Sequence, residues 1–194
     1  MWASTPLRAL SGALFMFVAA IATQLHAQSP APMSAGAPEV ALPESVRALA
    51  PRLEVRGMGN VRWFGLLVYH ARLWTLPGGW RASDQYALEI RYARSIKGEQ
   101  LARRSIDEMR HIGAGTDSQH QQWLQSMQQT FPDVNEADQL VGLATPGGAT
   151  RFFMNGKPIR AVEDPQFGPA FFGIWLSPAT SHPDLRRALL GLPK

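Results

Sequence analysis

Residues 53–75 read LEVRGMGNVRWFGLLVYHARLWT. Val, Leu, Trp, Phe and Tyr dominate this run and favour β-strands, whereas Gly57 and Gly59 interrupt it near its start. The run therefore predicts a short strand followed by a long one.

Successive side chains alternate between the two faces of a strand, which divides the long strand into two sets. One set holds Trp63, Gly65, Leu67, Tyr69, Ala71 and Leu73, and the other holds Arg62, Phe64, Leu66, Val68, His70, Arg72 and Trp74. Both sets are largely apolar at their centre, so we expect this strand to be covered on both sides.

The sequence after residue 75 predicts further strands and four helices. Apolar alternation in residues 86–96 predicts a half-buried strand with Tyr92 facing the core or a pocket. Further strands are expected at 139–144, 150–154 and 159–162, with Asn155-Gly156 as the turn of the last hairpin. Helical spacing predicts helices at 101–112 and 117–131, one starting at Asp164-Pro165, and one at 183–190 capped by Ser181. This order predicts an α+β domain in which helices cover one face of an antiparallel sheet.

The first 48 residues differ from the rest in composition. Arg8 precedes an uncharged apolar run at 9–22, and Leu25-His26-Ala27 follows, which is the layout of a secretory signal peptide. The run is short for a bilayer span, which favours cleavage after Ala27 over a retained anchor. We expect a signal peptide at 1–27, a flexible Ala/Pro/Ser-rich spacer at 28–48 and a folded domain at 49–194. The protein would then be periplasmic or secreted, with no stable membrane span after cleavage.

Composition and motif searches exclude several kinds of chemistry. The chain has no Cys, so thiol catalysis and disulfides are excluded and packing alone holds the fold. The formal net charge of +4 is dispersed, with no basic block that would indicate a nucleic-acid partner. The His residues never lie three to five positions apart, and no nucleophile motif or phosphate-binding loop occurs. We therefore expect no cofactor and no metal, and the sequence identifies no protein partner.

Several segments of the chain together form a recognisable combination. They are Gly57-Met58-Gly59, residues 63–69 (WFGLLVY), 71–74 (ARLW), 92–96 (YARSI), 104–106 (RSI), 131–134 (FPDV), 152–156 (FFMNG), 164–167 (DPQF) and 171–176 (FFGIWL). This combination resembles the chalcone isomerase-like family, in particular its bacterial exported branch. The resemblance spans about residues 53–192. It implies an open-faced sandwich, an antiparallel sheet with helices layered on one face and a ligand cleft between the two layers. The order of predicted elements agrees with this fold.

The resemblance implies two kinds of function. Plant enzymes of the family close a flavanone ring by intramolecular addition of a phenolate to an enone, without a cofactor, and related plastid members bind fatty acids. Fold alone does not choose between them. Since the aromatic-rich domain holds no catalytic constellation, the leading hypothesis is a non-catalytic binder of a small amphipathic acid such as a fatty acid. The alternatives are an intramolecular lyase or isomerase of chalcone-like enones, and a structural or interaction protein of the cell envelope.

The resemblance also implies an Arg near the first strands and a hydroxyl deeper in the cleft, which together meet the ligand's anionic oxygen. Arg56 and Arg62 are the candidates for this Arg, with Arg52 as a further alternative. Tyr69 and Tyr92 are the candidate hydroxyl groups.

Phe64 falls near the position where the enzymes carry a Thr, which argues against the isomerase reaction. We expect the ligand's head group near Arg56 or Arg62. Its tail is expected to run between the strand that carries Tyr69 and the helix that carries Phe167, Phe171 and Trp175.

Overall fold

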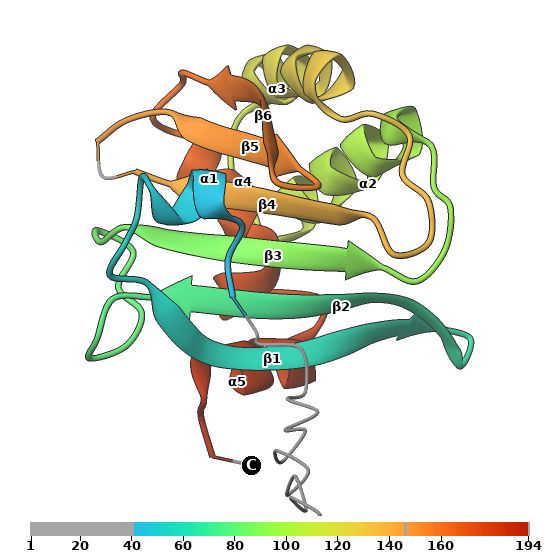
Figure 1. Ribbon diagram of the computed structural model, residues 1–194. Coiled ribbons are helices and arrows are strands. Elements are labelled where there is room, and N and C mark those ends of the chain that lie inside the picture. Colours follow the sequence, from blue (N-terminus) through green and yellow to red (C-terminus); the bar gives the residue numbers. More distant parts are fainter. Residues whose placement is uncertain (1–40, 146, 194) are drawn as a thin grey trace, which may run out of the picture. The chain divides into compact units, whose positions relative to one another are not determined.

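A computed structural model describes residues 41–145 and 147–193 of the chain. Its six strands form one antiparallel sheet in which every strand pairs with its sequence neighbour, in the order β1-β2-β3-β4-β5-β6 (Figure 1). The strands are β1 (Glu54–Trp63), β2 (Leu66–Thr75), β3 (Tyr86–Tyr92), β4 (Gln139–Ala144), β5 (Thr150–Met154) and β6 (Lys157–Val162). The helices are α1 (Glu44–Arg47), α2 (Gly98–His111), α3 (Asp117–Thr130), α4 (Phe167–Leu176) and α5 (Pro183–Leu190). The predicted α+β fold is confirmed.

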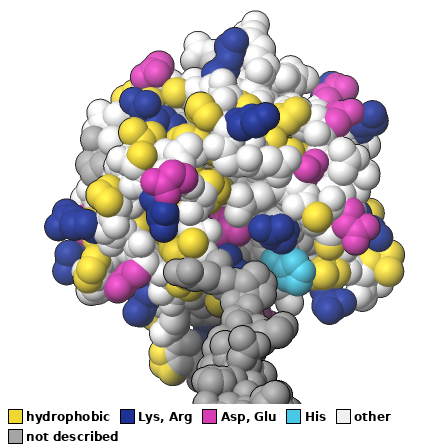
Figure 2. Space-filling view, in the orientation of Figure 1, with side chains coloured by type: hydrophobic (Ala, Val, Ile, Leu, Met, Phe, Trp, Pro, Cys, Tyr) yellow, Lys and Arg dark blue, Asp and Glu magenta, His cyan; other side chains and the backbone are white. Residues whose placement is uncertain are grey.

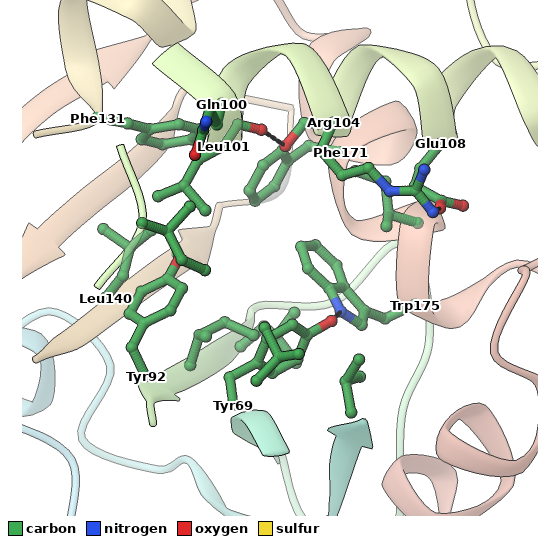
Figure 3. A pocket seen from close by; sticks show the side chains of 18 of the residues that line it. Tyr69, Tyr92, Gln100, Leu101, Arg104, Glu108, Phe131, Leu140, Phe171 and Trp175 are labelled. Atoms are coloured by element: carbon green, nitrogen blue, oxygen red, sulfur yellow. Dashed lines mark hydrogen bonds and ion pairs between the residues drawn. The ribbon is translucent and has the colours of Figure 1, made fainter. Parts of the chain in front are cut away.

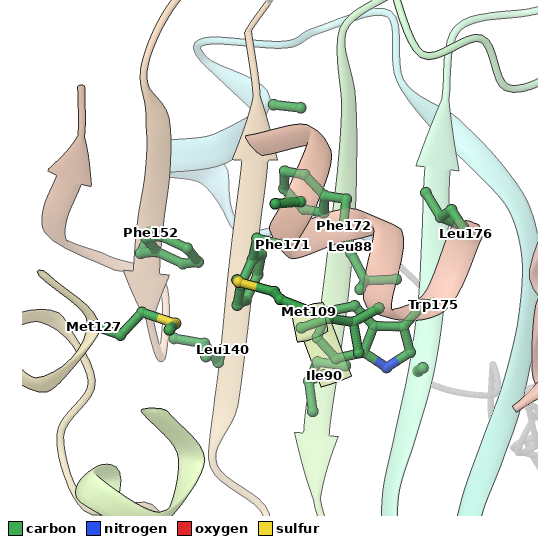
Figure 4. Packing of buried hydrophobic residues seen from close by; sticks show 14 of the residues in the cluster. Leu88, Ile90, Met109, Met127, Leu140, Phe152, Phe171, Phe172, Trp175 and Leu176 are labelled. Carbon is green, nitrogen blue, oxygen red and sulfur yellow. The ribbon is translucent and has the colours of Figure 1, made fainter. Parts of the chain in front are cut away.

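Helices α2 to α5 lie behind the sheet in Figure 1, and the main core fills the space between the two layers. In Figure 4, Phe171 and Trp175 of α4 lie over Leu88, Ile90 and Leu140 of the sheet. Phe171 packs edge-on against Phe152 at 90°, with the ring centroids 5.2 Å apart. Edge-to-face aromatic pairs add about 0.5–1.5 kcal/mol beyond the area that they bury. This aromatic layer fixes α4 against the centre of the sheet.

A smaller core covers the opposite face of the sheet. Leu42, Val46 and Ala50, in and around α1, are buried together with Trp74 and Phe153 from the strands. Strand β2 is therefore covered on both sides only towards its end, where Ala71, Leu73 and Trp74 are buried, whereas Leu66 and His70 are exposed. Residues 42–48 belong to this packed domain, so the predicted spacer ends earlier than residue 48 because Leu42 and Val46 bury their side chains on the sheet.

The predicted signal peptide at 1–27, and the predicted spacer as far as residue 40, lie outside the described residues. Among the residues that the structure describes, no helix combines the length and the apolar character needed to cross a membrane.

The predicted short strand and long strand are in fact two strands of equal length. A two-residue turn at Phe64-Gly65 separates β1 from β2, with φ angles of 47° and 78°. Phe64 is a poor turn residue, so the sequence pattern alone indicated a continuous strand. Gly57 lies inside β1 because α5 packs directly on it: a Cβ there would stand 2.1 Å from the Ala188 carbonyl oxygen.

Two predicted helix starts are also corrected. Asp164 precedes a turn, and α4 begins at Phe167. The Asp164 carboxylate accepts hydrogen bonds from the Gln166 backbone N–H at 2.8 Å and from Trp123 Nε1 at 2.7 Å, so it fixes the turn to α3. Ser181 does not cap α5; its hydroxyl donates to Glu108 Oε2 at 2.7 Å. Both side chains satisfy partners on other helices, which local sequence spacing does not reveal.

Candidate ligand-binding site

A cavity of about 420 Å³ lies between the inner face of the sheet and helices α2 and α4 (Figure 3). Its size falls within the usual range for small-molecule sites, about 300–1,000 Å³. Apolar side chains form most of its wall, and they include Leu88, Ile90, Leu101, Phe131, Leu140, Phe152, Phe171 and Ile174. The polar residues that line it are Arg62, Tyr69, Tyr92, Gln100, Arg104, Ser105, Glu108, Trp175 and His182.

Tyr69 and Tyr92 face each other across β2 and β3, where they are direct register partners. Their ring centroids are 6.3 Å apart, in an edge-on arrangement. Trp175 Nε1 donates a hydrogen bond to the Tyr69 hydroxyl at 2.9 Å. Burial raises the pKa of Tyr69 to about 12, and burial raises the pKa of Tyr92 further. Both phenols therefore stay protonated at neutral pH and can act as hydrogen-bond donors inside the cavity.

The Tyr92 hydroxyl has no hydrogen-bond partner among the described residues, although the side chain is only 6% exposed. The hydroxyl oxygen itself keeps accessible surface, because Tyr92 lines the cavity and its oxygen is not among the buried unpaired side-chain atoms. Figure 3 shows the Tyr92 ring entering the site between Leu140 and Leu101. A ligand atom in the cavity would supply the missing partner.

Charged groups gather at one side of the cavity. Arg104 and Glu108 lie one turn apart on α2, and Arg104 Nη2 donates to Glu108 Oε1 at 2.5 Å. Glu108 is buried and also accepts from Ser181, whereas the Arg104 side chain is 69% exposed. Burial has the largest effect on the pKa of Tyr69 and raises it, and the Trp175 hydrogen bond lowers it. Smaller effects come from the charge of Glu108, which raises the pKa, and from the charge of Arg104, which lowers it, so both charges act on that hydroxyl. The exposed guanidinium of Arg104 and the buried phenol of Tyr69 therefore line the same cavity.

The three arginines expected from the sequence lie in different places. Arg62 lines the cavity at its rim, where its Nη1 donates to the Gly65 carbonyl at 3.0 Å. Arg56 does not line the cavity, because its Nε donates to the Leu190 carbonyl at 2.9 Å, at the end of α5. Arg52 is exposed in the turn before β1 and is not among the lining residues. Of the three, only Arg62 lies where it could meet a ligand in this cavity.

Two of the three helix residues that were expected beside the ligand's tail line the cavity. Phe171 and Trp175 line the cavity, but Phe167 is fully buried in the aromatic core and does not. Phe64 lies at the exposed hairpin turn and not in the cleft.

Arg104 and Glu108 were missed by sequence reasoning about the site. Their four-residue spacing is typical of an exposed helical ion pair, and only the position of α2 over the sheet shows that Glu108 points inward. Among the described residues, no three His, Asp or Glu side chains are grouped as metal ligands.

The fold and the cavity define a sheet-and-helix protein with a mainly apolar cavity between its two layers. A family model described as chalcone isomerase-like matches residues 35–191, and the chain belongs to the chalcone isomerase-like family. The resemblance seen in the sequence is thus confirmed.

Two similar proteins illustrate the relationship. An uncharacterised protein of Haemophilus influenzae is 31% identical over 148 residues, which cover 75% of this chain and 72% of that protein. A crystal structure of a fatty-acid binding protein from Arabidopsis thaliana superposes with a TM-score of 0.56 at 9% identity. That match covers 72% of this chain and 87% of the plant protein. At this identity the likeness concerns the fold alone.

Proposed function

We propose that the protein binds a small amphipathic acid, such as a fatty acid, in this cavity and does not transform it. The observation that carries the proposal is an apolar cavity that contains an unpaired phenol, Tyr92, and opens beside the exposed Arg104. The Arabidopsis neighbour is a fatty-acid binding protein, which supports this proposal for the shared fold.

The distribution of polarity suggests how the ligand is oriented. Arg104 and Arg62 are exposed at the rim, whereas Phe152 and Leu140 are buried within the cavity wall. A carboxylate buried among apolar side chains would cost several kcal/mol without a charged donor. We therefore expect the head group beside Arg104 and the Tyr69 hydroxyl, and the tail between β2–β4 and α4.

The side chains in the cavity favour binding over catalysis. Raised pKa values keep Tyr69 and Tyr92 protonated, so neither is poised as a general base at neutral pH. The Glu108 carboxylate is occupied by Arg104 and Ser181. An assay that follows loss of a chalcone by absorbance should give the uncatalysed rate, and a faster rate would favour the isomerase alternative.

The cavity also bears on the third hypothesis, a purely structural protein of the envelope. Such a protein would fill the space between its layers with its own side chains, whereas here a volume of about 420 Å³ is left.

We retain export to the periplasm or beyond as a proposal, supported by residues 1–27. Fractionation of expressing cells, with sequencing of the mature N-terminus, should find the protein outside the cytoplasm with a start near Gln28.

A chain-length series tests the binding proposal. Delipidated protein is titrated with saturated fatty acids of increasing length, and Kd is measured by calorimetry. Each buried methylene contributes about 0.8 kcal/mol, so Kd should fall about fourfold per added carbon until the cavity is full, and then level off. No saturable binding at any length, together with no gain in Tm, would sink the proposal.

A further inference from the structure

The hairpin between β1 and β2 ends in large apolar side chains that are mostly exposed. Trp63 is 68% exposed, Phe64 89% and Leu66 56%. The Trp63 and Phe64 rings contact each other, with their centroids 5.3 Å apart. We call residues 63–66 the aromatic tip. Single exposed apolar residues are ordinary, but a group of large ones marks a site of interaction.

The backbone conformation of the aromatic tip is unusual for the residues that it carries. Phe64 has φ 47° and Gly65 φ 78°, both in the left-handed region. The same chain makes a second two-residue turn with nearly identical angles, 48° and 76°, and there it uses Asn155-Gly156, the residues such turns prefer. A bulky side chain is strained in the left-handed region. Neither turn geometry nor packing explains Phe64, so its exposed ring points to a partner outside the chain.

The aromatic tip lies at the mouth of the cavity, because Val61, Arg62 and Trp63 at the end of β1 also line the cavity. Figure 2 shows hydrophobic side chains at the edge of the molecule where this hairpin ends. The stretch between Glu54 and Asp84 contains no acidic residue. Arg62 uses one nitrogen on the Gly65 carbonyl, and its other N–H groups can meet a phosphate.

We propose that the aromatic tip inserts into the surface of a bilayer that contains anionic phospholipid. Trp and Phe side chains flanked by Arg suit the boundary between headgroups and acyl chains. The lack of acidic residues between Glu54 and Asp84 also favours an anionic surface. Docking would set the cavity mouth against the lipid, so that a ligand could pass between the membrane and the cavity. This role in ligand exchange rests on the proposed function, whereas docking itself does not.

Sedimentation with lipid vesicles tests the proposal. Delipidated protein is mixed with vesicles of phosphatidylglycerol and phosphatidylcholine in equal parts, or of phosphatidylcholine alone. The informative variant is Phe64→Asn, because Asn adopts the left-handed turn more readily than Phe. Its Tm should equal or exceed that of the wild type, while its partitioning onto the mixed vesicles falls at least about tenfold. Leu49→Asn is the matched control: Leu49 is 46% exposed but lies near α1, away from the tip.

The expected result is binding that is stronger to the mixed vesicles, lost in Phe64→Asn and kept in Leu49→Asn. The proposal is overturned if the wild type stays in the supernatant, if Phe64→Asn sediments like the wild type, or if Leu49→Asn loses binding equally. Equal partitioning onto both kinds of vesicle contradicts the anionic-lipid assignment. Since no fatty acid is present, failure here leaves the calorimetric titrations as a separate test of the cavity.

Discussion

Replacing Arg104 by Gln removes the charge that we place beside the ligand's head group. A charge-assisted hydrogen bond contributes about 1.5–3 kcal/mol, but the Arg104 side chain is 69% exposed, so solvent screening reduces its contribution. We therefore expect a loss of about 1.4 kcal/mol, a tenfold rise in Kd for a fatty acid. The matched alcohol, which carries no charge, should bind the variant and the wild type nearly alike.

Glu108→Gln should act in the opposite direction. The Glu108 carboxylate shares Arg104 with the proposed head group, and two like charges about 4 Å apart in water repel by about 1 kcal/mol. Removing this charge should lower the Kd for the acid about fivefold. The Ser181 hydroxyl can still donate to the Gln oxygen, so the local packing is kept.

The double variant separates binding from stability. Arg104→Gln alone leaves a buried carboxylate without its cation and should lower Tm, whereas Arg104→Gln with Glu108→Gln should regain Tm and still bind the acid weakly. Calorimetry with acid and alcohol, alongside thermal unfolding, measures both effects. If Arg104→Gln binds the acid like the wild type, or if acid and alcohol lose affinity equally, the head group does not lie at Arg104.

Three other predictions concern the tyrosines and the opposite face of the sheet. Tyr92→Phe should leave the ligand-free protein as stable in urea unfolding as the wild type, or up to about 1 kcal/mol more stable. The reason is that the Tyr92 hydroxyl has no hydrogen-bond partner among the described residues. A loss of stability above about 1 kcal/mol would show that the hydroxyl does have a partner. The folded pKa of Tyr69 is raised from 10.0 to about 12, so its contribution is fully present below pH 10 and declines as the pH rises towards 12, by about 1.4 kcal/mol per pH unit. Tyr69→Phe should flatten that decline in urea unfolding at pH 9 to 11.5, and an unchanged slope would count against the assignment. Glu89 is buried and accepts hydrogen bonds from Arg72, Trp74 and Gln139. Glu89→Ala should therefore destabilise the fold by about 3–5 kcal/mol without changing the affinity for a fatty acid. A parallel loss of affinity would show that this hydrogen-bond network supports the cavity.

Local patterns were enough to predict most of the fold. Alternation predicted the strand that carries Tyr92, and Asn155-Gly156 marked its hairpin because these residues prefer that turn. The turn at Phe64-Gly65 was missed because Phe does not signal a turn. Helix starts were misplaced where a side chain is used in tertiary structure, as at Asp164, whose carboxylate binds Trp123.

The site was less predictable than the fold. Tyr69 and Tyr92 were candidates through the resemblance to the family, and strand alternation also predicted that Tyr92 faces the core or a pocket. Arg56 and Arg62 were the candidates because they lie nearest the strand of Tyr69, yet the Arg56 guanidinium donates to the end of α5. Arg104 reaches the cavity only because α2 crosses the sheet, and sequence spacing carries no information about that crossing.

A crystal structure of the protein with a saturated fatty acid bound tests the central claim most directly. The account predicts continuous density for one acyl chain between β2–β4 and α4, against Leu140, Phe152 and Phe171. The carboxylate should lie within hydrogen-bond reach of Arg104 and the Tyr69 hydroxyl. Density for the acid elsewhere on the protein, or a cavity that holds only water when the acid is in excess, would contradict it.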